Sequence, residues 1–535
     1  MRNRRKLPSE PATHDVAAAL AALGADELRE LLRNVLLELD ERSRGRVVNA
    51  LINRAARSGS SWTPAAVSDT AASEALAFAG AAQRAGHANP EDVDERLRRG
   101  SAAFLRKDYA AAHRILGALL PPIGDGEIDL GQDEMMDEVL AADPGECAAQ
   151  YVVSAYMLAA PGRRAEAVSA AIDEVRGVGD FSEPLREMER VAVEPLPRLD
   201  DFLRDWRAVV AKQAGRARRS DWDTEADRWQ REVVRRLDGA AGLAEIARST
   251  KRADDLRAWC ESLVETRDWQ AALSAFEEAA AIVADKDHAR GELLDGAALA
   301  AQELGHQDLS PWLERAWRAA PSMLRLRRWL GSSRTRTEIK ERAAEALAEC
   351  PKRADRQHAF LHVLRADFAS AAKLLSAAPG LGWSESEHPG RLLFCALQAL
   401  LTGESAMLSA GGGSSLSERG LDGEELMFLA ATPDEPRIAT PEVGEILRQA
   451  GVDGVPGPGA RSAVLAAMRK AAERRVAGVT EQKRRSRYGH AAELVAGCLA
   501  CDRTPDTLRW AAAVRAEHRR FPAFVAELDR RVKAR

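Results

Sequence analysis

The amino-acid sequence predicts an all-α protein built from short helical hairpins. Apolar residues recur with the i, i+3, i+4 spacing of one face of an α-helix, whereas the strict alternation typical of β-strands is almost absent. The first apolar stripe consists of Leu28, Leu31, Leu32, Val35 and Leu39. Helix-breaking pairs such as Pro121-Pro122, Pro161-Gly162 and Pro379-Gly380 interrupt the pattern at short intervals. The sequence therefore favours a series of helix-turn-helix units over a few long rods.

Composition narrows the class of protein further. The chain has 535 residues, 46% of them hydrophobic, and a formal net charge of -5, so it can bury a large core and is not uniformly basic. Six scattered cysteines are too few for a disulfide framework and favour a reducing compartment. No signal-peptide pattern follows the basic first residues, and no run of about 18 apolar residues occurs. We therefore expect a cytoplasmic protein that does not enter a membrane, and the Ala- and Arg-rich composition suggests a bacterial source.

One short pattern repeats along the chain. An aspartate is followed by an aromatic residue and, three positions after that residue, by an alanine that begins an apolar helical stretch. The three copies begin at Asp108-Tyr109, Asp268-Trp269 and Asp367-Phe368. Repeats of this kind are typical of arrays of similar helical hairpins.

The segment around the second copy resembles a tetratricopeptide repeat, a pair of helices in which small residues allow close approach. The matching positions are Leu256, Trp259, Cys260, Leu263, Ala272, Phe276 and Ala279. Weaker copies extend the resemblance over roughly residues 90 to 400, although most lack the family's tryptophan and glycine and their spacing is irregular. The resemblance implies an irregular α-solenoid whose concave surface binds a partner.

The N-terminal helices also resemble the helical regions that accompany SWIM-type zinc fingers in bacterial proteins. That finger requires Cys-x-Cys and Cys-x-His, and neither pattern occurs in this sequence. The resemblance therefore implies no zinc ion and no DNA-binding role.

Changes in composition divide the chain into four predicted regions. Residues 1–90 form an N-terminal helical region, and residues 91–403 form the repeat array. Residues 404–460 are rich in Gly, Ser and Pro and are predicted to be a linker or loop region. Residues 461–535 form a C-terminal helical unit that carries a basic patch.

The stretch LGWSESEHPG, residues 381 to 390, concentrates reactive side chains in a connector. We expect a helix to start at Pro389 and run to Gly403, because proline fits the first helical position and disfavours helical geometry at His388. Trp383 is then expected to fold back over the hairpin. We identify Trp383, Glu387 and His388 as candidate contacts to a partner, and a catalytic loop containing Glu387 and His388 is the weaker alternative.

No motif predicts a metal ion, a cofactor or a known enzyme. The acidic stretch from Asp125 to Glu138 places its glycine one position late for an EF-hand and has Met136 where the last ligand should be. Cys498 and Cys501 lack the second pair that structural zinc requires, and we expect two buried side chains on one helix face. Phosphate-binding glycine motifs are absent from the sequence.

Basic residues cluster near the C-terminus. The candidate residues for binding phosphate or an acidic partner are Arg469, Lys470, Arg474, Arg475, Lys483, Arg484, Arg485 and Arg487. The main hypothesis is a non-catalytic scaffold or adaptor that binds a protein or peptide, as a subunit or regulator of a bacterial complex. The alternative is an accessory protein that binds nucleic acid through residues 469–487. The third is an enzyme with an unfamiliar site, and the sequence specifies no oligomeric state.

Overall fold

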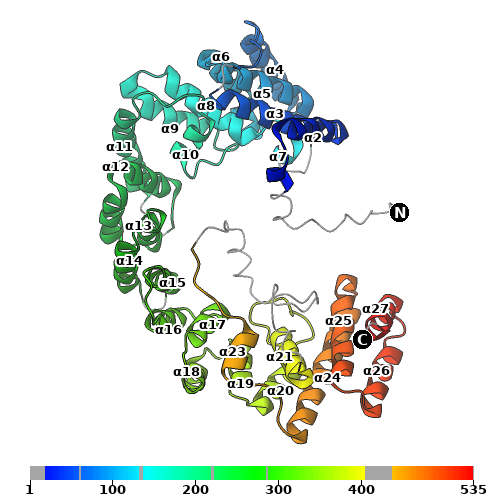
Figure 1. Ribbon diagram of the computed structural model, residues 1–535. Helices are drawn as coiled ribbons and strands as arrows, with labels where there is room; N and C mark the ends of the chain where they lie inside the picture. Colours follow the sequence, from blue (N-terminus) through cyan, green and yellow to red (C-terminus); the bar gives the residue numbers. More distant parts are fainter. Residues whose placement is uncertain are drawn as a thin grey trace. The chain divides into compact units, whose positions relative to one another are not determined.

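The all-α prediction is confirmed in the computed structural model, which describes residues 19–59, 62–131, 136–217, 222–284, 287–403 and 436–533 (Figure 1). These residues are mostly helical and contain no β-strand; the described part has only an isolated bridge between His87 and Asp129. None of the helices in these ranges combines the length and apolar character needed to cross a lipid bilayer.

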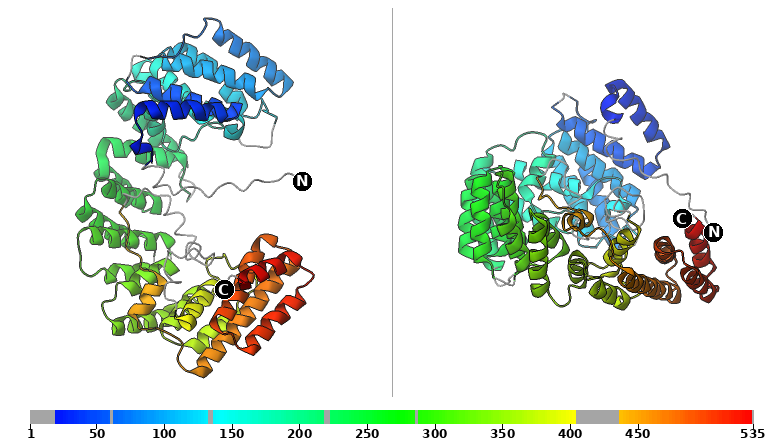
Figure 2. Two further views of the ribbon diagram at one scale, coloured as in Figure 1. Left: turned by 45° about the vertical axis from the view of Figure 1, so that its right-hand side comes forward. Right: turned by 60° about the horizontal axis from the view of Figure 1, so that its bottom comes forward.

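The chain divides into two compact units, Met1–Leu243 and Ala244–Arg535 (Figure 2). The division falls inside α12 (Glu225–Thr250), which is kinked at Gly239 with φ 61° and ψ -149°. That conformation is open essentially to glycine alone. The predicted boundaries at residues 90, 403 and 460 do not coincide with this division.

Unit 1 is a set of helices packed around α6 and α8. Its elements are α2 (Ala25–Glu38), α3 (Glu41–Arg57), α4 (Ala71–Ala85), α5 (Pro90–Leu105), α6 (Tyr109–Gly124), α7 (Met136–Val139), α8 (Pro144–Leu158), η1 (Pro161–Arg163), α9 (Arg164–Glu174), α10 (Pro184–Val191), α11 (Leu199–Ala217) and the first part of α12. Helix α6 contacts α4, α5 and α8, and α8 also contacts α9 and α10. The predicted break at Pro121-Pro122 is wrong: both prolines lie inside α6, in its last turn, and the helix ends at Gly124.

A buried carboxyl group on α12 makes the stability of unit 1 depend on pH. Glu232 accepts hydrogen bonds from the backbone N–H groups of Leu185 (3.1 Å) and Arg186 (2.9 Å), at the start of α10. Burial nevertheless raises its pKa to about 7, because removal from water penalises the carboxylate more than these two bonds stabilise it.

We predict that the contribution of Glu232 to the free energy of unfolding falls as pH rises from about 4.5 to about 7. Between these values the folded state holds a proton that the unfolded state has lost, so each increase in pH favours unfolding, by on the order of 3 kcal/mol in total. Urea denaturation of the wild type and of Glu232→Gln should show the variant gaining relative to the wild type between pH 4.5 and pH 8. An equal difference at both pH values would contradict this assignment.

Unit 2 continues the series of short helices. Its elements after α12 are α13 (Ala253–Glu265), α14 (Trp269–Ile282), α15 (His288–Glu303), α16 (Ser310–Ala319), α17 (Met323–Gly331), α18 (Arg336–Glu349), α19 (Asp355–Leu364), α20 (Phe368–Ala377), α21 (Gly390–Thr402), α23 (Val443–Gln449), α24 (Pro458–Glu481), η4 (Arg485–Arg487), α25 (Tyr488–Cys501), α26 (Pro505–Glu517) and α27 (Pro522–Lys533). From α13 to α17, each helix packs on the next, and α24 packs on α20 and α25.

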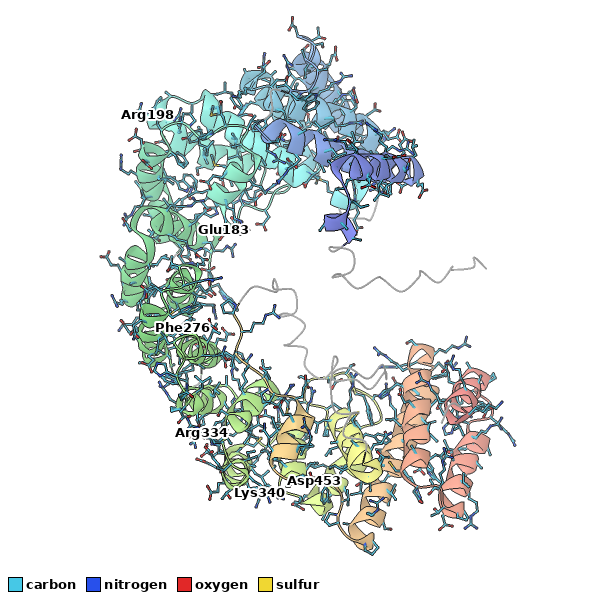
Figure 3. All side chains as sticks on the ribbon, viewed as in Figure 1. Glu183, Arg198, Phe276, Arg334, Lys340 and Asp453 are labelled. Carbon is cyan, nitrogen blue, oxygen red and sulfur yellow. The ribbon has the colours of Figure 1, made fainter. Side chains whose placement is uncertain are left out.

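Small residues and stacked tryptophans form the core of unit 2. Gly296 on α15 allows the ring of Phe276 on α14 to approach so closely that a Cβ atom at Gly296 would lie 2.3 Å from it (Figure 3). Trp317 and Trp329 stack with ring centroids 5.1 Å apart, and both are almost fully buried. The indole N–H of Trp317 donates to Gln357 (2.8 Å), which satisfies its polar atom in the core.

Part of the predicted linker belongs to this core. Residues 404–435 of the 404–460 region lie outside the described residues, but α23 buries Val443, Ile446 and Leu447. The prediction is therefore corrected for residues 436–460. Helix α17 supplies hydrogen-bond donors to the segment before α23: Arg327 donates to the backbone carbonyl of Pro441 (2.9 Å), and Arg328 donates to the side-chain hydroxyl of Thr440 (2.9 Å).

The repeated aspartate opens a helix in all three copies. Asp108, Asp268 and Asp367 precede α6, α14 and α20, and each carboxylate accepts a hydrogen bond from the backbone N–H three residues later, at 3.0, 3.2 and 3.1 Å. The residue before each aspartate has a positive φ: 66° at Lys107, 56° at Arg267 and 58° at Ala366. The carboxylate thus caps the exposed amide groups of the second helix of the hairpin.

Candidate functional site

The LGWSESEHPG stretch is a connector between α20 and α21 that is fastened to α24. Helix α21 begins at Gly390, one residue after the predicted start, and ends at Thr402, followed by Gly403 with φ 76°. On α24, Arg474 donates to the carbonyl of Ala378 (3.3 Å) and Arg475 to that of Gly380 (3.1 Å). Gly380 is pressed so tightly against α24 that a Cβ atom there would lie 2.2 Å from the carbonyl oxygen of Arg474.

Two of the three predicted contact residues in this connector are internal. Trp383 is 4% exposed and His388 is 7% exposed, whereas Glu387 is exposed. The backbone N–H of Gly390 donates to Nδ1 of His388 (3.1 Å), so Nε2 carries the proton and donates to the carbonyl of Pro379 (3.0 Å). Burial lowers the pKa of His388, which favours this neutral form.

These positions correct the interpretation of Trp383 and His388 as surface contacts. Both rings are buried by packing against the helices behind the connector, and both ring nitrogens of His388 are used by the backbone, which leaves none for acid–base catalysis. Trp383 lies 5.3 Å from the ring of His490 on α25 and 6.0 Å from the guanidinium of Arg475, measured between ring centroids and to the guanidinium carbon. The connector therefore supports α24 and α25, and only Glu387 stays a predicted partner contact.

The predicted basic patch is divided by the structure. Arg469 is half-buried and bonded to Asp502 (3.0 Å) and Thr507, and Arg475 is 5% exposed. Arg474 is exposed but bonded to the connector, and Lys470 is exposed near the middle of α24, roughly 15 Å from the end of that helix. The remaining four side chains, Lys483, Arg484, Arg485 and Arg487, are all exposed in the turn between α24 and α25. We call these four residues the basic turn.

The basic turn has the backbone geometry of the three aspartate turns, with the charge reversed. Lys483 has the positive φ, 53°, and Arg484 (φ -78°, ψ 70°) occupies the position of Asp268 (φ -81°, ψ 73°). The backbone N–H of Arg484 donates to the carbonyl five residues earlier (2.8 Å), as that of Asp268 does (3.0 Å). A guanidinium therefore stands where a capping carboxylate stands elsewhere, and neither η4 nor α25 receives a side-chain cap.

The positive charges of the basic turn are not neutralised by any carboxylate among the residues that the structure describes. Within the described ranges, no carboxylate forms an ion pair with any of its four side chains, whereas other arginines of unit 2 are paired, such as Arg248 with Glu278 (2.6 Å) and Arg515 with Asp529 (2.8 Å). Burial, and then the charges of Arg487 and Arg484, lower the pKa of Arg475 to about 10. The unpaired guanidinium groups of Arg484 and Arg487 are thus close enough to repel Arg475, and an anion bound at the basic turn would relieve this repulsion.

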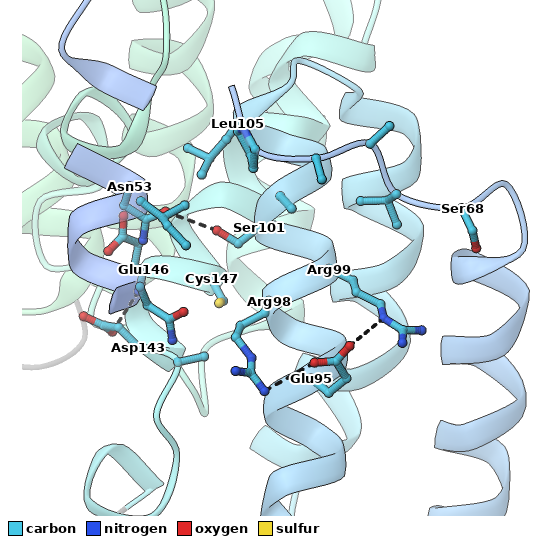
Figure 4. Close-up of a pocket in the computed structure, with 18 of the residues that line it drawn as sticks. Asn53, Ser68, Glu95, Arg98, Arg99, Ser101, Leu105, Asp143, Glu146 and Cys147 are labelled. Atoms are coloured by element: carbon cyan, nitrogen blue, oxygen red, sulfur yellow. Dashed lines mark hydrogen bonds and ion pairs between the residues drawn. The ribbon is translucent and has the colours of Figure 1, made fainter. Parts of the chain in front are cut away.

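Unit 1 contains a separate cavity of about 630 Å³ (Figure 4). It lies among α3, α4, α5, α8 and residues 64–68. Most of the charged groups in its lining form ion pairs: Glu95 with Arg98 (3.3 Å) and Arg99 (3.0 Å), and Glu146 with Arg57 (3.0 Å).

One cysteine, Cys147, lies in the wall of the cavity. Burial raises the pKa of its thiol, which keeps the sulfur in its weakly nucleophilic protonated form. Neither histidine nor lysine is among the lining residues, whereas the carboxylates of Asp143 and Glu146 are. Sequence reasoning missed this cavity, because its walls come from helices about 100 residues apart.

Metal ligands are not gathered in the part of the chain that the structure describes: no group of three or more His, Cys, Asp or Glu side chains there could hold a metal ion. The six cysteines, all within the described ranges, form no disulfide, and Cys498 and Cys501 lie on α25, the first buried and the second half-buried. The acidic stretch is described only in part, since residues 132–135 lie outside the described ranges.

Comparison of the chain with models of known protein families finds no match, and comparison with curated proteins finds none either.

Proposed function

We propose that the chain is a non-catalytic scaffold of tetratricopeptide-like helical hairpins that binds an acidic protein segment at the basic turn. The observation that carries the proposal is the charge reversal in this turn. Three turns of one geometry hold their own capping carboxylate, whereas the fourth holds Arg484 and three further cations with no carboxylate partner among the described residues. An acidic side chain from a partner can supply the missing anion at the start of the following helix.

The residues that pack against the basic turn favour a binding surface that is formed before the partner binds. Arg475 and the connector fix the end of α24, and Trp383 contacts both Arg475 and His490 below the turn. A partner therefore meets side chains on a rigid base and orders little protein on binding, which favours affinity. The scaffold part of the proposal is supported by the consecutive packing of α13 to α17 and by the small residues between them.

Nucleic acid is the second candidate, because the same four cations could contact successive phosphates. The two candidates differ in how binding depends on salt: contacts to a nucleic-acid backbone give a steep loss of affinity with salt, through release of condensed counterions. The affinity of a folded surface for one acidic peptide segment depends less on salt and more on the sequence of the peptide.

Fluorescence anisotropy with two labelled probes tests the proposal. The probes are a glutamate-rich 12-residue peptide and a single-stranded 12-nucleotide DNA, each titrated with the full chain over a range of salt concentrations. We expect Arg484→Glu with Arg485→Glu to raise the Kd for the peptide by at least about tenfold, because attraction becomes repulsion. The matched control is Lys352→Glu with Arg353→Glu, which makes the same charge change at two exposed residues before α19.

The outcomes of this titration distinguish the proposed site from a net-charge effect and from nucleic-acid binding. Equal loss in both variants would show that only net charge matters and would contradict a site at the basic turn. Tighter binding of the DNA with a steep salt dependence, lost only in the Arg484/Arg485 variant, would replace the acidic segment by nucleic acid.

A further inference from the structure

The first described hairpin, α2 with α3, exposes an unusual amount of apolar surface. Of the fourteen large hydrophobic side chains that are exposed among the described residues, seven lie between residues 20 and 51. They are Leu20, Leu23, Leu31, Val35, Leu37, Val48 and Leu51. None of the fourteen residues of α2 is buried, although half of them are apolar. A helix of this length has marginal stability in water unless one face is packed, so we expect another protein surface to cover the hairpin.

The hairpin itself is well formed. Asp40 in its turn caps α3 by accepting from the backbone N–H of Ser43 (3.0 Å). Arg44 on α3 donates to the carbonyls of Leu36 (2.7 Å) and Leu39 (2.9 Å), the last carbonyls of α2 and its turn. Asn49 donates to the carbonyl of Ala141 (3.1 Å), which ties α3 to the body of unit 1. The exposed side chains therefore stand on a fixed frame.

The charges of the two helices are opposite. Helix α2 carries four carboxylates and two arginines, whereas α3 carries five arginines and one glutamate. On α2, Glu27 and Glu38 lie four residues before and seven residues after Leu31, on the same face as Leu31 and Val35. On α3, Arg44 lies four residues before Val48 and Arg54 lies three residues after Leu51, again on the exposed apolar face.

We propose that this hairpin is the contact surface for a second copy of the chain, with α2 of one copy packed on α3 of the other. A two-fold contact places one surface against itself, so the surface must be complementary to itself. An apolar stripe with an acidic helix beside a basic helix meets this condition, since rotation brings the exposed Glu38 of each copy toward the exposed Arg54 of its partner. The two hairpins then form a four-helix arrangement whose apolar residues cover one another. This inference is independent of the basic turn.

Light scattering of the full chain after size-exclusion chromatography, over a series of concentrations, tests the proposal. The wild type should have the mass of two chains, and Leu31→Asp with Val35→Asp should have the mass of one. The matched control is Leu76→Asp on α4, a leucine that is 67% exposed outside the hairpin, and it should retain the dimer. Unchanged circular dichroism and unchanged binding at the basic turn would show that the variant is folded.

A charge exchange makes the test specific for a two-fold contact. Glu38 and Arg54 are both exposed, and neither has an ion-pair partner among the described residues. Glu38→Arg and Arg54→Glu should each weaken the dimer, because each creates like charges across it. Mixing the two variants should give more dimer than either variant gives alone. In the mixed dimer both α2–α3 contacts pair opposite charges, one in the wild-type order and the other with the two charges exchanged. A wild type that stays monomeric, a Leu31/Val35 variant that stays dimeric, or a mixture without recovery would each overturn the proposal.

Discussion

Replacing Gly380 by alanine should lower the free energy of unfolding of unit 2 by about 3 kcal/mol. The added Cβ atom would lie 2.2 Å from the carbonyl oxygen and 2.8 Å from the carbonyl carbon of Arg474. Both are backbone atoms of α24, which no rotamer change can move aside. The connector must therefore separate from α24, and the hydrogen bond from Arg475 to Gly380 lengthens or breaks.

Hydrogen exchange followed by mass spectrometry would locate this effect. Protection should fall in residues 378–390 and 474–490 of Gly380→Ala, while helices α13 to α16 keep their protection. Gly459→Ala is the matched control, because a Cβ atom at Gly459 meets nothing within 4 Å and the residue lies in the first turn of the same helix. A stability equal to that of the control would show that the connector is not pressed against α24 as described.

Replacing Asp94 by alanine should destabilise unit 1 by about 3 to 5 kcal/mol. The buried Asp94 carboxylate on α5 accepts hydrogen bonds from the backbone N–H groups of Ala141 and Ala142, each at 2.8 Å. Alanine would leave both donors without an acceptor in a buried environment. Ala142 also lines the cavity of unit 1, so the wall of the cavity should loosen with the loss.

Urea denaturation together with hydrogen exchange at residues 136–158 would measure this change. Asp92→Ala is the control, since Asp92 lies on the same helix but is exposed and forms only a surface ion pair with Arg96 (3.6 Å). Its loss should cost about 0.5 kcal/mol or less. Equal destabilisation by the two variants would contradict the role given to the Asp94 carboxylate.

Local features of this fold could be predicted from the sequence because local residues determine them. The i, i+3, i+4 stripe from Leu28 to Leu39 predicted α2, and the aspartates of the repeated pattern lie where α6, α14 and α20 begin, which they cap. The start of α21 was placed within one residue, because proline restricts the backbone on both sides of itself.

Long-range contacts could not be predicted in this way. From the sequence, Arg469 and Arg475 resembled members of a solvated patch. In the structure Arg469 donates to Asp502, 33 residues later, and Arg475 donates to Gly380, 95 residues earlier. The basic turn could not be recognised from the sequence either, because its likeness to the aspartate turns lies in the backbone angles. A guanidinium at a capping position cannot be recognised by composition alone.

The arginines of α17 bind residues that are synthesised much later, so unit 2 can complete its folding only late in synthesis. Arg327 is almost fully buried, and it donates to Pro441, which leaves the ribosome 114 residues later. A nascent chain that has reached only residue 403 can pair its early hairpins, but these donors lack the acceptors on Thr440 and Pro441. Hairpin formation is therefore fast and local, whereas the closing of residues 436–452 on α17 must wait for most of the chain. Truncation before residue 436 should consequently leave a nascent-like intermediate that exposes α17 to chaperones.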